Sequence, residues 1–173
     1  MAVLPILIFP DDRLSQPAEP VAEFGDDVQG LAADLIDTML DGSSAVGIAA
    51  PQIGQHKRVV IVDVSAMMQS SRKHKPKSSN NGRMVLVNPE IVQREGEIAG
   101  REGCLSVPDY TGNVVRADSI VVRAFDIYGN ATQFRCRGFE SRAMQHEIDH
   151  LDGILFLDRV ISPRELFRRK VYK

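Results

Sequence analysis

The chain has 173 residues, of which 43% are hydrophobic and 25% charged, and its formal net charge is −2 at pH 7. This length suits one domain over residues 1–173 with a substantial core, and the near-neutral charge gives no sign of DNA binding or of attachment to anionic membranes. The two cysteines, Cys104 and Cys136, are too few for a disulfide framework and favour a reducing compartment.

An apolar run at residues 3–9 is the first feature along the chain. Pro5 interrupts this run, and Asp11 and Asp12 follow it. The run lacks a basic start and is too short to span a bilayer, so it is typical of neither a signal peptide nor a transmembrane helix. We therefore expect a cytoplasmic protein without a membrane partner.

An amphipathic helix is the first long element that the sequence predicts. After a turn at residues 10–14, apolar residues recur at helical spacing from Asp26 to Leu40. Asp26 or Asp27 is the expected N-cap, and Gly42 is expected to end the helix.

Strands dominate the middle of the chain. The β-branched run at residues 58–64 predicts a buried strand. The polar and basic stretch at residues 65–83 predicts an exposed, mobile loop, with an RNA-contacting patch as the alternative. Residues 128–130 (Tyr-Gly-Asn) predict a hairpin turn. The further predicted strands cover residues 84–87, 91–94, 119–126 and 132–137.

Two helices are predicted towards the C-terminus. The first runs from about Ser141 to Leu151 and is closed by Gly153, and the second is short and starts at Ser162-Pro163. The strands surround a central helix rather than alternate with helices. We therefore predict an α+β fold of mostly antiparallel sheets around that helix, with an N-terminal helix and a short C-terminal helix.

The central helix carries the run Gln-His-Glu-Ile-Asp-His at residues 145–150. His146 and His150 are four residues apart and therefore share one face of the helix, where they can hold one metal ion. Glu147 lies beside them and can act as general base towards a metal-bound water. The alternative is a surface helix with two unrelated histidines.

A catalytic metal needs at least one more protein ligand. In a zinc endopeptidase the third ligand would follow the helix, where Asp152, Asp158 and Glu165 are the candidates. Upstream, the run Glu-Gly-Cys-Leu-Ser at residues 102–106 offers Cys104, whose thiolate is a good ligand for Zn²⁺ or Fe²⁺. The alternative for Cys104 is a buried structural cysteine.

Small residues at 47–54 (Gly-Ile-Ala-Ala-Pro-Gln-Ile-Gly) allow a ligand to approach the backbone closely. The side-chain amide of Gln52 could stabilise an oxyanion there. Plain packing of small residues is the alternative reading of this stretch.

Taken together, these segments resemble the peptide deformylase family of bacteria. The family's motifs occur here in the same order, at residues 45–52, 102–106 and 145–150. Residues 4–11 and 151–156 are also similar to the family, so the resemblance covers nearly the whole chain. Such enzymes remove the N-formyl group from the initiator methionine of nascent proteins, which makes N-formylmethionyl peptides and nascent chains the implied partners.

The resemblance also implies the chemistry. One divalent metal is expected, usually Fe²⁺, with Zn²⁺, Ni²⁺ or Co²⁺ able to replace it. Its implied ligands are Cys104, His146 and His150. A metal-bound hydroxide would attack the formyl carbon, with Glu147 as general base and then acid, and formate would leave. The side chain of Gln52 and the backbone N–H of Leu105 would help the metal to hold the oxyanion.

The substrate is expected to bind in an extended conformation, with its backbone paired to Val46-Gly47 and to Gly103. An apolar pocket would take the methionine side chain. Its implied walls are Val46, Gly47, Phe139, the aliphatic stem of Arg142, Ala143 and His146. The last four fall on one helical stripe, although Phe139 and Ala143 could equally be core residues.

Three positions depart from the family pattern. Ala45 replaces a glycine and could narrow the groove, although we expect full activity. Gly100 is often bulkier in relatives and could leave the pocket mouth more open. Thr111 stands where a basic residue is common, so contacts to later substrate residues could differ.

The C-terminal tail is basic and suggests docking on the ribosome through RNA phosphates, although cations also suit the end of a helix. The tail cations are Arg164, Arg168, Arg169, Lys170 and Lys173. Two other functions stay open at this point, a zinc endopeptidase and a non-catalytic binder of nascent chains or ribosomes. The presence of Glu147, Gln52 and all three implied ligands argues against the non-catalytic alternative.

Overall fold

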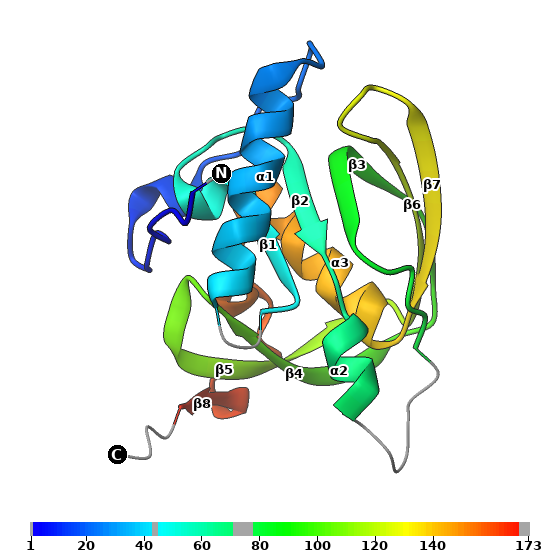
Figure 1. Cartoon of the computed structure of the whole chain (residues 1–173). Coiled ribbons are helices and arrows are strands. Elements are labelled where there is room, and N and C mark those ends of the chain that lie inside the picture. Colours follow the sequence, from blue (N-terminus) through cyan, green and yellow to red (C-terminus); the bar gives the residue numbers. More distant parts are fainter. Residues whose placement is uncertain (1, 43–44, 71–77, 170–173) are drawn as a thin grey trace.

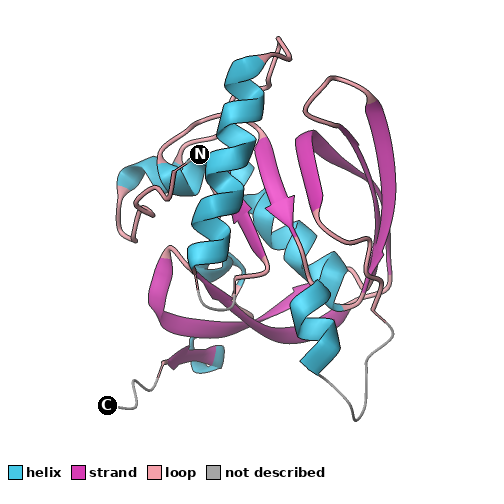
Figure 2. Cartoon of the chain, viewed as in Figure 1, coloured by secondary structure: helices cyan, strands magenta, loops and turns pink. Residues whose placement is uncertain are grey.

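Two antiparallel sheets and three α-helices make up the part of the chain that the computed structural model describes, residues 2–42, 45–70 and 78–169 (Figure 1). The helices are α1 (Asp26–Asp41), α2 (Ser65–Ser70) and α3 (Phe139–Leu151). The five-stranded sheet has the order β1 (Gly47–Ala49), β2 (Val59–Val62), β3 (Met84–Glu95), β6 (Ser119–Phe125) and β7 (Ala131–Arg137). The three-stranded sheet has the order β4 (Ile98–Cys104), β5 (Val107–Arg116) and β8 (Leu166–Arg168). The predicted α+β class is confirmed (Figure 2).

Strand β2 is buried on both faces, which explains its continuous β-branched sequence. Val59 and Ile61 pack in one core cluster with apolar residues of α1. Val60 and Val62 pack in a second cluster with apolar residues of α3. Side chains alternate between the faces of a strand, so β2 lies between the two helices and fixes α3 at the centre of the molecule.

Helix α3 is almost completely buried although eight of its 13 residues are polar or charged. Gly138 precedes it and Gly153 follows it, both with positive φ (59° and 71°), a conformation that glycine adopts without strain. The predicted central helix therefore exists, and its buried polar residues require partners on the surrounding strands.

Several local predictions differ from the structure. The N-cap of helix α1 is Gly25, which makes no side-chain hydrogen bond, and not Asp26 or Asp27. These two residues occupy the first turn, where their negative charges interact favourably with the helix dipole. Strand β3 is one strand with register shifts where two were predicted. The predicted loop at residues 65–83 begins with helix α2. Residues 71–77, which include most of the suggested RNA-contacting patch, lie outside the described residues.

Strands β4 and β5 were not predicted, because three glycines and alternating charged residues give them a weak strand signal. The short C-terminal helix was also predicted wrongly. Pro163–Glu165 form a single 3₁₀ turn, and the chain then pairs as β8 with β5. Tertiary pairing has overridden the local capping pattern at Ser162.

Strands β1 and β4 each lie at the edge of a sheet. Among the residues that the structure describes, β1 pairs only with β2, and β4 pairs only with β5. Residues at both edges line one cleft, with α3 beneath it. Unpaired backbone groups on facing edges suit the binding of an extended peptide.

Candidate metal centre and substrate cleft

The three residues expected to bind a metal come together at the base of the cleft. Cys104 ends β4, and His146 and His150 lie one turn apart on α3. One donor atom from each residue lies within 4.8 Å of the others, and all three residues are buried. The Sγ of Cys104 is 3.2 Å from Nε2 of His150. One thiolate and two imidazoles at this spacing fit a single divalent ion such as Zn²⁺ or Fe²⁺.

Glu102 orients the first imidazole. Its Oε2 lies 2.9 Å from Nδ1 of His146, which leaves Nε2 of that ring for a metal. Arg116 donates to both oxygens of Glu102, at 2.9 and 3.0 Å. Burial raises the pKa of Glu102, but the hydrogen bonds from His146 and Arg116 outweigh it and bring the pKa to about 2.

A second carboxylate extends this network to the surface. Asp149 accepts a hydrogen bond from Arg116 at 2.5 Å and two from Arg159 at 2.5 and 2.7 Å. The guanidinium of Arg116 is therefore held between Glu102 and Asp149. This chain of charge-assisted hydrogen bonds fixes the carboxylate of Glu102, which in turn orients the ring of His146.

The thiol of Cys104 is set up as a thiolate. Burial raises its pKa, but the imidazoles of His150 and His146 lower it further, and the net pKa lies well below 9.0. The backbone N–H of Ser106 also points at Sγ, at 3.4 Å. A thiolate is the form of cysteine that binds a metal.

Glu147 lies next to the ligand set and is free to work as a base. Its side chain is buried, and Oε2 has no hydrogen-bond partner among the described residues. Burial raises the pKa of Glu147 to about 7, against the opposing effect of the two imidazoles. The backbone of Gly47 passes so close that a Cβ there would lie 2.5 Å from Oε1 of Glu147.

Gln52 faces the same centre. Its Oε1 accepts the backbone N–H of Ala49 at 2.9 Å, which fixes the amide. Its Nε2 lies 3.2 Å from Oγ of Ser106 and 3.5 Å from Sγ of Cys104. The amide N–H groups therefore point towards the ligand set, where negative charge would be stabilised.

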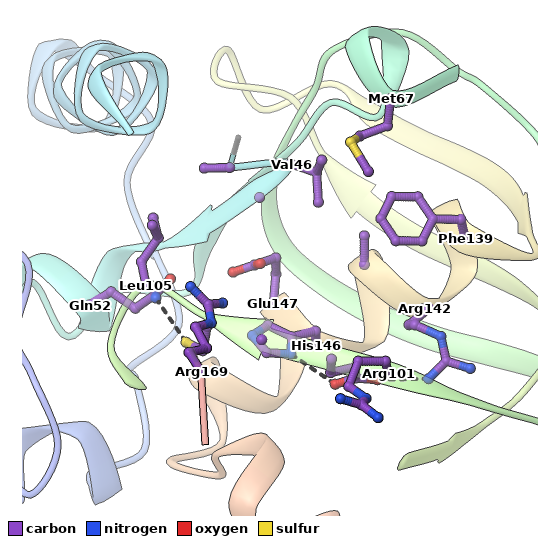
Figure 3. Close-up of a pocket in the computed structure, with 16 residues that line it drawn as sticks. Val46, Gln52, Met67, Arg101, Leu105, Phe139, Arg142, His146, Glu147 and Arg169 are labelled. Carbon is purple, nitrogen blue, oxygen red and sulfur yellow. Dashed lines mark hydrogen bonds and ion pairs between the residues drawn. The ribbon is translucent and has the colours of Figure 1, made fainter. Parts of the chain in front are cut away.

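The cleft above this centre has a volume of about 390 Å³. Every residue that the sequence assigned to catalysis or substrate binding lines it, and His150 lies behind it against Cys104. Ala45, which was expected to border the groove, also lines the cleft. Four further residues line it without having been predicted to do so: Met67, Arg101, Glu102 and Arg169. Figure 3 shows Phe139, Met67 and Val46 around one end of the cleft and Arg169 near Leu105 at the other.

A comparison with protein families now decides the identity. The family described as polypeptide deformylase matches residues 3–165. The chain belongs to this family. It is therefore an enzyme, a hydrolase that removes the N-formyl group from the N-terminal methionine of nascent proteins and releases formate. Deformylases are metal-dependent, and Cys104, His146 and His150 form a possible metal site in the structure.

Individual deformylases agree over nearly their full lengths. The peptide deformylase of Thermodesulfovibrio yellowstonii is 43% identical over 98% of this chain and 97% of its own. A crystal structure of the Legionella pneumophila peptide deformylase is 40% identical, with a TM-score of 0.81 over 95% of this chain and 89% of its own. An Acinetobacter baumannii deformylase with bound Met-Ala-Ser has 38% identity and a TM-score of 0.80, covering 92% of this chain and all (100%) of its own. These similarities give no support to the endopeptidase or non-catalytic alternatives.

Arg142 of this deformylase is more than a pocket wall. Its guanidinium is buried and donates to Glu102 at 3.0 Å and to backbone carbonyls of Gly100 and Ile98 at 3.2 and 2.9 Å. A Cβ at Gly100 would lie 2.7 Å from Nη2 of Arg142. The small residue at position 100 therefore makes room for the Arg142 guanidinium.

No motif in the sequence predicts the arginines around the candidate metal centre. Arg116 and Arg159 reach Asp149 from β5 and from the 3₁₀ turn Phe156–Arg159. These segments come together only in the folded chain, so no local sequence pattern predicts their contact. Within the described residues, no helix is long and apolar enough to cross a membrane.

Proposed function

We propose that deformylation takes place in the cleft between β1 and β4. The metal ligands are Cys104, His146 and His150, and Glu147 is the acid-base residue. One observation carries this proposal. Three soft or borderline donor atoms lie within 4.8 Å of one another, next to a buried carboxylate oxygen that has no partner among the described residues. We also propose that residues 1–173 form one catalytic domain.

The resident metal is Fe²⁺, with Zn²⁺, Ni²⁺ or Co²⁺ able to replace it. A mixed thiolate and imidazole set accommodates all four ions, and Fe²⁺ is the ion that the family resemblance favours. When bound, the ion supplies a Lewis acid that lowers the pKa of a water molecule and polarises the formyl oxygen.

The protein residues then carry the proton and hold the charge. Glu147 accepts a proton from the attacking water and delivers it to the leaving nitrogen, so the C–N bond breaks, formate leaves and the amine is released. Its pKa of about 7 suits both directions of transfer near neutral pH. The amide of Gln52 and the backbone N–H of Leu105 donate to the developing oxyanion.

The formylated peptide binds as an added strand. The edges of β1 and β4 offer unpaired backbone groups through Val46, Gly47 and Gly103. The methionine side chain enters the end of the cleft lined by Phe139, Arg142, Ala143 and Val46, and Met67 adds a flexible apolar surface there.

The test is the Glu147→Gln variant, loaded with Ni²⁺ and assayed for formate release from formyl-Met-Ala-Ser. We expect metal binding to stay at one ion per chain while kcat falls by about 10²–10⁴-fold, the usual contribution of a general base. Glu97→Gln is the matched control, because it removes the same charge at an exposed position and should keep full activity. Wild-type turnover in Glu147→Gln would exclude this role.

The iron assignment has its own test. Protein purified without oxygen should contain iron and should lose both iron and activity in air, because thiolate and Fe²⁺ both oxidise. Ni²⁺ should restore activity to metal-free protein. Anaerobic protein that contains zinc and is indifferent to air would overturn the assignment.

We further propose that the enzyme acts in the cytoplasm on nascent chains and docks on ribosomes through its basic tail. The clustered tail cations support this, since RNA presents a dense row of phosphates. Cosedimentation with ribosomes should fall when Arg164 and Lys173 are both changed to glutamine, and it should also fall at high salt. Binding that is unaffected by either change would contradict the proposal.

A further inference from the structure

The C-terminal strand carries an arginine into the substrate cleft. Strand β8 pairs with β5 so that Phe167 lies opposite Thr111 and Arg168 opposite Tyr110. The backbone N–H of Arg169 then donates to the carbonyl of Asp109 at 2.8 Å, which continues the ladder by one residue. This pairing fixes the start of the Arg169 side chain, and the side chain lines the cleft (Figure 3).

The guanidinium of Arg169 lies directly over Gly103. A Cβ built on Gly103 would overlap Nη2 of Arg169, so the glycine provides the space that the guanidinium occupies. Side chains alternate along β4, with Glu102 and Cys104 buried towards the metal centre. Arg101 and Gly103 are exposed on the opposite face, and Arg169 therefore shares a face with Arg101.

Arg101 is held in place by neighbouring strands. Its Nε lies 3.2 Å from Oδ1 of Asn113, and its Nη1 lies 3.3 Å from Oγ1 of Thr111. Its guanidinium also lies 3.7 Å from the centre of the Phe167 ring. None of these partners is an anion, so the charge of Arg101 is positioned without being neutralised.

Arg169 is likewise not neutralised. Within the described part of the chain its guanidinium has no side-chain hydrogen bond or ion pair, and the carboxylate of Asp109 across the ladder does not pair with it. Arg142, the third arginine of the cleft, is instead bound to Glu102 and to carbonyl groups. Two available cations therefore lie on the same face of β4, Arg101 on the strand itself and Arg169 over Gly103.

The peptide path in the proposed function gives these cations a target, and the inference rests on that path. Along an extended peptide, successive side chains point to opposite sides. If the methionine side chain faces Phe139 and Ala143 on α3, the side chain of the second residue faces the side of Gly103. We propose that Arg169, together with Arg101, is a specificity determinant that favours formyl peptides with an acidic second residue.

The test compares kcat/KM for formyl-Met-Glu-Ala, formyl-Met-Gln-Ala and formyl-Met-Lys-Ala with the metal-loaded enzyme. The wild type should prefer glutamate to glutamine by about fivefold, the upper range for a solvent-exposed ion pair, and should disfavour lysine. The preference should appear mainly in KM, because the ion pair forms equally in the ground and transition states. At 1 M salt it should shrink, because the screening length is then only about 3 Å.

Three variants distinguish the contribution of Arg169 to this preference from that of its neighbours. Arg169→Gln should bring the glutamate-to-glutamine ratio close to one, and Arg169→Lys should keep most of the preference. Arg168→Gln is the matched control, because it removes the same charge from the adjacent residue, whose side chain points to the other face of β8. This control should retain the wild-type ratio.

Four results would overturn the proposal. The first is that the active wild type hydrolyses all three peptides at equal rates, and the second is that the preference for glutamate survives Arg169→Gln. The third is that glutamate is preferred at the third residue, in formyl-Met-Ala-Glu, and not at the second. The fourth is that Arg169→Gln accelerates every peptide equally, which would mean that the guanidinium only obstructs the cleft. If the metal-loaded wild type hydrolyses no formyl peptide at all, the proposed function itself fails and the inference falls with it.

Discussion

At the scale of single residues, the backbone of Gly47 approaches the carboxylate of Glu147, the proposed acid-base residue, very closely. A Cβ at position 47 would lie 2.5–2.8 Å from three atoms of the buried Glu147 side chain, so the carboxylate would have to shift towards the cleft that it lines. Gly47→Ala should therefore displace the carboxylate and lower kcat about 10²-fold, because small misplacements of a reacting group are costly.

Metal content separates this effect from unfolding. Gly47→Ala should still bind one ion per chain, since the three atoms nearest to the new methyl group all belong to Glu147, which is not one of the proposed ligands. Steady-state formate release together with metal analysis would check this. Full activity in Gly47→Ala would mean that Glu147 does not need its present position.

Glu102 links the metal centre to acid stability. Its pKa of about 2 in the folded chain lies below the ordinary value of 4.5. A lowered folded pKa means that the ionised group stabilises the folded state fully above pH 4.5, and that this contribution disappears as the pH falls towards 2. Glu102→Gln should therefore destabilise the metal-free protein more at pH 7 than at pH 3.

Urea unfolding of both proteins at the two pH values measures this difference. Glu102→Gln should also weaken metal binding about 10–100-fold, because Glu102 orients His146 from behind. A destabilisation that is the same at pH 7 and pH 3 would show that the carboxylate charge is not the stabilising element.

At the scale of elements, two glycines at different helix positions should respond in opposite ways to alanine. Gly30 lies inside α1, where an added Cβ would meet no atom within 4 Å, so Gly30→Ala should stabilise the fold by about 1 kcal/mol. Gly153 follows α3 with a φ of 71°, and its Cβ would lie 2.5 Å from the backbone oxygen of Ser15. Gly153→Ala should destabilise by about 2 kcal/mol or more.

Thermal or urea unfolding of the two variants checks this pair. The position of α3 depends on the turn at Gly153, so Gly153→Ala should lose metal affinity as well as stability. If both variants change stability in the same direction, the assigned helix ends are wrong.

The elements that could be predicted from sequence are those whose signal is local. The spacing of His146 and His150 predicts a shared helix face, and the β-branched run of β2 predicts a buried strand. The short sequence motifs around Cys104 and Gln52 placed these two residues in the predicted site. Strands β4 and β5 escaped prediction because Gly100, Gly103 and Gly112 weaken the pattern. Those same glycines admit the side chains of Arg142, Arg169 and Val160, which no local pattern could reveal.

The C-terminal segment illustrates the opposite error. Ser162-Pro163 has a good local pattern for the start of a helix, yet the next residues pair with β5 as strand β8. The local preference of this segment for a helix contributes less free energy than the backbone hydrogen bonds that it gains at an open sheet edge. As a result the arginine at position 169 enters the cleft, where a helical tail would have carried it elsewhere.

At the scale of the whole molecule, the proposed metal joins the two sheets through α3. Cys104 belongs to the three-stranded sheet, and both histidines belong to the helix that packs under the five-stranded sheet. A metal ion that binds only the folded state, at a free concentration of about 1,000 times its dissociation constant, raises the free energy of unfolding by about 4 kcal/mol. Chelation should therefore lower Tm by about 10 °C.

Cys104→Ala provides the comparison for this prediction. It should abolish the difference in Tm between metal-loaded and chelated protein, whereas Cys136→Ala should keep that difference, because Cys136 lies in the core outside the ligand set. Calorimetry on the four samples would show this directly. An equal metal-dependent shift in Cys104→Ala would remove the thiolate from the site.

Formate release from formyl-Met-Ala-Ser is the most direct test of the account as a whole. The protein should be purified without oxygen, loaded with Fe²⁺ or Ni²⁺, and shown to hold one ion per chain. We predict rapid release that chelator abolishes and fresh metal restores. Failure to release formate from protein that holds its ion through Cys104, His146 and His150 would contradict the assignment of this cleft as the deformylase centre.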